Sequence, residues 1–234
     1  MAEQLASEGP PSLLGITIRR SFVTGRVYFI VGLLYVFFLS IALSFSGPAS
    51  FDSSFPIILP IFTVLGAIGG LTVFANDRIK GTFEYLLAYG VRPRHIFTEI
   101  LITSLALVTI ELGLALALGL GIYLGLGNAL SADLLLALGL YAIPESYVCA
   151  ALMAMLGVFW TSLSSPRAGL NSPVGFVPFF GILPQIITLI LAGVFSDYRY
   201  DVLVGNVAVV VVIVLALLSL TNRLMPRERL LSPA

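Results

Sequence analysis

The sequence NDRIKGTFEYLLAYGVRPRH, residues 76–95, is the longest polar interruption inside a chain of 234 residues. Long apolar runs lie on both sides of it, and its basic residues are Arg78, Lys80, Arg92 and Arg94. Because basic residues close to membrane spans stay on the cytoplasmic side, we expect this stretch to be a cytoplasmic loop between two spans.

The other basic residues extend the same alternation along the chain. Apart from Arg199, they form clusters separated by pairs of apolar stretches, at Arg19, Arg20 and Arg26, at Arg167, and at Arg223, Arg227 and Arg229. The connections within those pairs are acidic instead, with Asp52, Asp133, Asp197 and Asp201. The pattern predicts six spans with the N and C termini both in the cytoplasm.

Composition supports a membrane protein. The chain is 59% hydrophobic and 10% charged, and a soluble core of this size cannot bury so much apolar surface. We expect an all-α integral membrane fold, a single domain over residues 1–234, in the plasma or inner membrane. The six spans are expected at about residues 27–46, 56–75, 96–127, 134–160, 174–195 and 202–222. The net charge of zero gives no reason to expect a nucleic-acid partner.

The segment before the first span is weakly amphipathic. In residues 12–26, Leu14, Ile18 and Phe22 recur at a spacing of four, with Arg19 and Arg20 off that stripe. This spacing favours an interfacial helix lying along the cytoplasmic surface. The alternative is a plain N-terminal extension of span one.

A second short helix is expected inside the polar stretch. Gly81 and Thr82 can begin it, Glu84 suits its first turn, Gly90 can close it and Pro93 prevents its continuation. One face then carries the apolar residues Phe83, Leu86 and Leu87. Since a helix of about two turns is marginal alone, something must hold it. That support is either the headgroup layer and neighbouring spans, or the groove of a cytoplasmic protein.

The sequence GTFEYLLAYGVRPRHIFTEIL, residues 81–101, resembles the cytoplasmic signature of type-2 ABC transporter permeases. Asp77 fits the acid that this family places before the Gly-Thr pair, whereas Ile79 and Glu99 depart from its pattern. The resemblance implies a coupling helix, which docks on an ATP-binding subunit, formed by Gly81, Thr82, Phe83, Glu84, Leu86 and Leu87. It also implies an assembly of two permeases, as two copies or paralogues, with two ATPases.

ATP hydrolysis is not expected on this chain. Lys80 precedes Gly81 and Thr82 but lacks the glycine spacing of a phosphate-binding loop. We therefore expect this chain to be no enzyme and to bind no cofactor, with ATP and Mg²⁺ on the partner ATPase. The family mostly exports, so the expected substrate is hydrophobic or amphipathic and moves outward.

Two acids lie deep in predicted spans, where an ionised side chain costs at least about 2.5 kcal/mol unless it faces protein or water. These are Glu111 and Glu145, and together with Tyr147 they are candidates for a substrate pathway. The plainer interpretation is packing alone, with each acid protonated or hydrogen-bonded to Tyr147, Ser146 or a neighbouring helix. Glu99 lies near the cytoplasmic boundary, and we expect it to pair with Arg92, Arg94 or His95.

Three local features qualify the spans. Pro144 should kink the fourth span. The prolines and glycines near residues 174–201 leave open either a re-entrant element or one kinked span. Gly121 and Gly125 form a small-xxx-small pair, which favours close packing within the bundle over a dimer interface.

A secondary transporter is the competing functional class. An ion gradient would then drive transport, with Glu111 and Glu145 as proton sites. An intramembrane enzyme would need a constellation of catalytic residues, and one histidine with scattered acids does not supply it. The sequence selects neither the cargo, nor the direction with certainty, nor a homodimer over a heterodimer.

Overall fold

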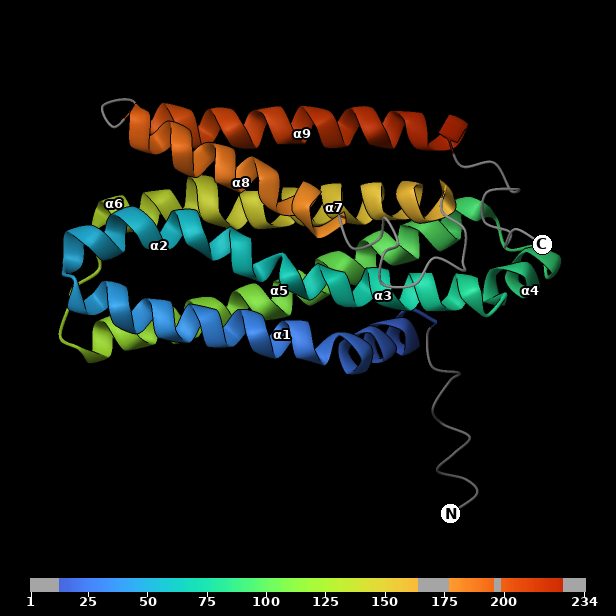
Figure 1. Cartoon of the computed structure of the whole chain (residues 1–234), viewed down its shortest axis with the longest axis horizontal. Helices are drawn as coiled ribbons and strands as arrows, with labels where there is room; N and C mark the ends of the chain where they lie inside the picture. Colours follow the sequence, from blue (N-terminus) through green and yellow to red (C-terminus); the bar gives the residue numbers. More distant parts are fainter. Residues whose placement is uncertain (1–12, 164–176, 196–198, 225–234) are drawn as a thin grey trace, which may run out of the picture.

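The computed structural model describes residues 13–163, 177–195 and 199–224, and within them it is helical with no strand (Figure 1). The helices lie side by side in an elongated bundle. They are α1 (Leu13–Phe45), α2 (Pro48–Thr63), α3 (Leu65–Ile79), α4 (Thr82–Ala88), α5 (Pro93–Gly125), α6 (Ala132–Ala137), the π-helical turn η1 (Leu138–Ala142), α7 (Ile143–Leu163), α8 (Val177–Val194) and α9 (Arg199–Leu224).

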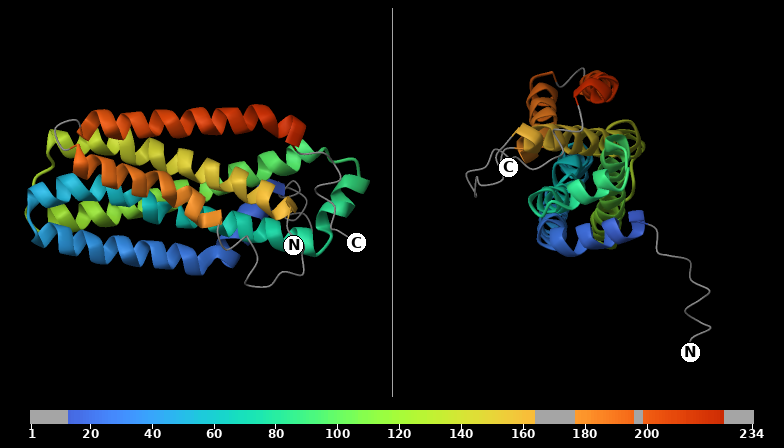
Figure 2. Two further views of the ribbon diagram at one scale, coloured as in Figure 1. Left: turned by 45° about the horizontal axis from the view of Figure 1, so that its top comes forward. Right: turned by 90° about the vertical axis from the view of Figure 1, so that its right-hand side faces the viewer.

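Five helices are long and apolar enough to cross a membrane: Thr17–Phe45, Pro48–Ile68, Pro93–Gly125, Ala132–Gly157 and Tyr200–Ser219. They correspond to five of the six predicted spans. The predicted fifth span, residues 174–195, begins outside the described residues, and its apolar helix Ile182–Val194 is shorter. In Figures 1 and 2, α8 starts near the middle of the bundle's length and runs toward one end. Residues 174–201 were expected to form either a re-entrant element or one kinked span, and this segment lies partly outside the described residues.

The N-terminal segment does not form a separate helix. α1 runs without a break from Leu13 to Phe45, so residues 13–26 continue directly into the first span. The right view of Figure 2 shows the start of α1 turned across the end of the bundle, so the interfacial position of this segment is not contradicted and stays a prediction. The four-residue spacing of Leu14, Ile18 and Phe22 is common to both arrangements, so the pattern could not separate them.

The bundle has two ends of different construction. The start of α1, the junction of α3, α4 and α5, and the end of α9 lie at one end, which we call the α4 end (Figure 1). The opposite end holds the turns between α1 and α2 and between α5 and α6 (Figure 1). The chain alternates between these two ends in the order that the basic residues predict. Which side of the membrane each end faces stays a prediction.

Two of the predicted spans are irregular where proline occurs. The second span is divided at Val64 into α2 and α3, and α2 contains Pro56 and Pro60. In the fourth span, η1 immediately precedes the helix that contains Pro144. A proline lacks the N–H that an α-helix needs and crowds the preceding turn, and a π-helical turn is one way to accommodate it. The structure shows η1 before Pro144, and the kink expected there stays a prediction.

Candidate functional site

The short helix α4 has the caps that its sequence predicts. Gly81 precedes it at φ 70°, and the N–H of Glu84 donates to the carbonyl of Gly81. At its other end Gly90 has φ 85°, and the N–H groups of Gly90 and Val91 donate to the carbonyls of Leu87 and Leu86. This pair of bonds is a Schellman ending, which needs the left-handed conformation that glycine adopts freely.

The apolar face of α4 packs on its own bundle. Phe83 and Leu87 are 5% and 3% exposed, and Leu86 is partly buried beside them. The Phe83 ring lies 5.0 Å from the Phe74 ring of α3, between centroids. The rest of this cluster comes from α5 and α7: Ile96, Phe97, Ile100 and Met155. The described contacts show that neighbouring helices hold α4 in place, which is one of the two supports expected for it.

A partner protein would therefore meet the opposite face of α4. Tyr85 is 68% exposed and Tyr89 at its end is 87% exposed, with Glu84 also at the surface. Gly81 and Thr82 are half-buried at the start of the helix. The docking role of this region stays a prediction, but Phe83 and Leu87 are not available to a partner while packed in this way.

An ion pair joins α1 to α3 beside α4. Arg20 donates to both carboxylate oxygens of Asp77, at 2.6 and 3.2 Å. Paired N–H donors of this kind fix both position and orientation. The sequence singled out Asp77 but gave no reason to choose Arg20 as its partner, because the two residues lie on different helices, 57 positions apart.

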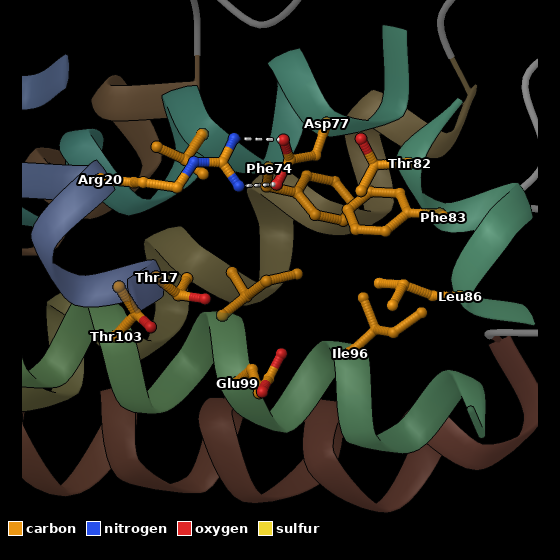
Figure 3. Close-up of a pocket in the computed structure, with 12 residues that line it drawn as sticks. Thr17, Arg20, Phe74, Asp77, Thr82, Phe83, Leu86, Ile96, Glu99 and Thr103 are labelled. Atoms are coloured by element: carbon orange, nitrogen blue, oxygen red, sulfur yellow. Dashed lines mark hydrogen bonds and ion pairs between the residues drawn. The ribbon is translucent and has the colours of Figure 1, made fainter. Parts of the chain in front are cut away.

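A pocket opens between α1, α3, α4 and α5 at this end (Figure 3). Its volume is about 160 Å³, and its walls include Phe74, Phe83 and the Arg20–Asp77 pair. Glu99 also lines it and is partly buried, and Figure 3 shows its carboxylate on the wall opposite Asp77. Glu99 makes no ion pair with the described parts of the chain, so its predicted pairing with Arg92, Arg94 or His95 is wrong. Those three side chains are exposed, whereas Glu99 turns toward the pocket.

Comparison with known proteins returns no match: no protein-family model, no curated protein and no solved structure resembles the chain significantly. The resemblance of residues 81–101 to ABC permeases thus stays a hypothesis based on the residues themselves. Among the described residues, no group of three or more His, Cys, Asp or Glu side chains is arranged to hold a metal ion.

Glu111 lies between two glycines in the middle of the bundle. It is 1% exposed, and no described side chain hydrogen-bonds to its carboxyl oxygens. Gly32 of α1 and Gly66 of α3 approach so closely that a Cβ atom at either position would overlap those oxygens. The absence of a side chain at both glycines leaves the room that the carboxyl group occupies.

Glu145 is buried by a different arrangement. It is 0% exposed, and its Oε1 accepts hydrogen bonds from Asn206 Nδ2 of α9 at 2.8 Å and from Cys149 Sγ at 3.2 Å. The predicted bond to a neighbouring helix is therefore present, through Asn206, whereas the predicted bonds to Ser146 and Tyr147 are not formed. The Ser146 hydroxyl instead donates to the carbonyl of Ala142.

The three candidates for a substrate pathway have different neighbours. Glu111 faces α1 and α3, Glu145 faces α9, and the Tyr147 hydroxyl donates to Thr109 of α5 at 3.1 Å. No described hydrogen bond links one of these residues to another. A common path lined by all three stays a prediction. Sequence reasoning missed Asn206, although a lone amide inside an apolar run signals a buried hydrogen bond.

Proposed function

We propose that this chain is the membrane subunit of an ATP-driven transporter of the ABC-2 type, which exports a hydrophobic or amphipathic substrate. ATP and Mg²⁺ bind a separate ATPase subunit, which docks on α4 and the residues around it. Two such membrane subunits, as two copies or paralogues, enclose the pathway in the plasma or inner membrane. The α4 end then faces the cytoplasm.

The observation that carries this proposal is the attachment of α4 to three longer helices. Phe83 and Leu87 pack with Phe74 of α3, with Ile96 of α5 and with Met155 of α7. A force applied to the exposed face of α4 therefore passes into those helices, because packed side chains do not deform independently. A short cytoplasmic helix without this attachment could move without moving the spans.

Docking on α4 is best tested on its exposed face, because Phe83 and Leu87 are buried in the bundle. Replacing Leu86 by a charged residue would disturb the packing of α4 itself, since Leu86 contacts the cluster around Phe83. Tyr85 and Tyr89 are better targets because both are largely exposed. Their rings supply the large apolar contact area that is common at the centres of protein interfaces.

The experiment is affinity purification of the tagged full chain from its own cells in mild detergent, with the ATPase measured by mass spectrometry and by ATP hydrolysis. We expect an ATPase with a phosphate-binding loop to copurify, and its recovery to fall at least about tenfold when Tyr85→Glu and Tyr89→Glu are combined. The matched control is Leu130→Glu at the opposite end, which is 40% exposed and should leave recovery unchanged. Equal recovery from all three proteins would contradict docking on α4.

The alternative, an ion-gradient-driven secondary transporter, is favoured by one observation. Glu111 and Glu145 are both almost fully buried, as proton-carrying acids in a bundle often are. Such a transporter would work in vesicles that contain this chain alone, and an uncoupler would stop it. Transport that requires the ATPase and persists with an uncoupler excludes it.

A further inference from the structure

We propose that the pocket beneath α4 binds a small aryl-alkyl ammonium ion, with the charged nitrogen at Glu99 and the aromatic ring against Phe74 and Phe83. This inference goes beyond the proposed function, because binding requires neither an ATPase nor transport. It rests on the charge, the shape and the unused hydrogen-bonding groups of the pocket.

The charge of the pocket is unbalanced. Among the described residues that line the pocket, Arg20 is the one cation, and both of its terminal nitrogens are committed to Asp77. Glu99 has no ion pair or hydrogen bond with the described residues. The pocket thus offers one carboxylate without a counterion among the described side chains, in a partly enclosed site where a charge interaction is stronger than in bulk water.

A buried hydroxyl accompanies that carboxylate. Thr103 is 0% exposed, lines the same pocket, and its Oγ1 has no hydrogen-bond partner within the described parts of the chain. Thr98 and Thr109 on the same helix each donate to the carbonyl four residues earlier. Thr103 follows Glu99 by four positions, so the two side chains share one helix face. An ammonium group can donate to both.

The opposite wall fits an aromatic ring. Phe74 and Phe83 lie 5.0 Å apart between ring centroids with their planes at 35°, and Figure 3 shows them across the pocket from Glu99. Aromatic faces attract cations and also bury apolar groups. The volume of about 160 Å³ is close to that of a cavity that holds benzene, near 150 Å³. The volume therefore limits the occupant to one ring with at most a short chain.

Three matched compounds test the inference: phenethylammonium, the neutral 2-phenylethanol and the anionic phenylacetate. Their binding is measured by equilibrium dialysis against the full chain in a nonionic detergent, with protein-free micelles as the blank. We expect the cation to bind at least about tenfold more tightly than the alcohol. Equal or tighter binding of phenylacetate would overturn the proposal.

Two substitutions locate the site. Glu99→Gln keeps the size of the side chain and removes its charge, and should weaken phenethylammonium binding at least about tenfold while leaving 2-phenylethanol unchanged. Thr103→Val removes a hydroxyl that has no internal partner, so it should preserve thermal stability and weaken the cation about threefold. The control Asp133→Asn removes an exposed acid at the opposite end and should change neither. Wild-type affinity in Glu99→Gln, or an equal loss in Asp133→Asn, would refute a site at Glu99.

Discussion

Glu111 and Glu145 are both buried acids in the middle of the bundle, but their surroundings differ. Glu145 receives hydrogen bonds from Asn206 and Cys149, whereas Glu111 receives none from a side chain and lies between Gly32 and Gly66. Hydrogen-bond donors accommodate Glu145, whereas the missing side chains of Gly32 and Gly66 leave room for Glu111. A substitution near Glu145 should therefore act through a lost hydrogen bond, and one near Glu111 through a steric overlap.

The largest effect on stability is expected at Gly66. Gly66→Ala should destabilise the protein by about 1–3 kcal/mol, because the new methyl group overlaps the Glu111 carboxyl. Combining it with Glu111→Ala should recover part of that loss. The measurement is thermal unfolding in detergent.

The control for Gly66 is another glycine. Gly113→Ala places a methyl group where no atom of the described residues lies within 4 Å, so it should be neutral or slightly stabilising. If both alanine variants unfold at the same temperature, the close approach at Gly66 is wrong.

A smaller effect is expected beside Glu145. Asn206→Leu removes the donor of the 2.8 Å bond and should cost about 1–2 kcal/mol, since the carboxyl oxygen loses its amide partner. Thermal unfolding again reports the change. Val212→Leu on the same helix is the control, because Val212 is 65% exposed and faces away from the bundle. An unchanged unfolding temperature in Asn206→Leu would show that Glu145 does not depend on this bond.

The smallest effect is expected for the ion pair at the α4 end. Arg20→Gln should cost no more than about 1 kcal/mol, because the Arg20 side chain is 47% exposed and water screens the pair. A double-mutant cycle with Asp77→Asn measures the interaction directly. A coupling energy well above that value would mean that the pair is shielded from water more fully than its exposure indicates.

The sequence predicted those features that depend on neighbours along the chain. Hydropathy located five long apolar helices, and Gly81 and Gly90 located the ends of α4 within a residue or two. The five helices reflect a local requirement, since the hydrocarbon layer needs about 20 apolar residues. Glycine at the ends of α4 likewise answers a local backbone requirement.

The features that sequence analysis missed depend on residues far apart in the chain. The Gly121 and Gly125 pair predicted close packing, but a Cβ atom at either would meet nothing within 4 Å in the described part of the chain. The tight contact is at Gly119 instead, where an added Cβ would overlap the Phe55 ring. A spacing of four residues identifies a face without saying what that face meets, and the same limit hid Asn206 and the glycines around Glu111.

The glycines beside Glu111 also bear on how the chain is made. Gly32 and Gly66 belong to α1 and α3, which leave the ribosome before α5 and its Glu111. The protein surface that receives the acid is therefore synthesised ahead of it. A circular permutant that begins with α5 would reverse this order and send the carboxyl group into lipid first, at a cost of roughly 2.5–3.5 kcal/mol if it is ionised. In a chain that inserts into a membrane from its N-terminus, this order presents the two glycines before the acid.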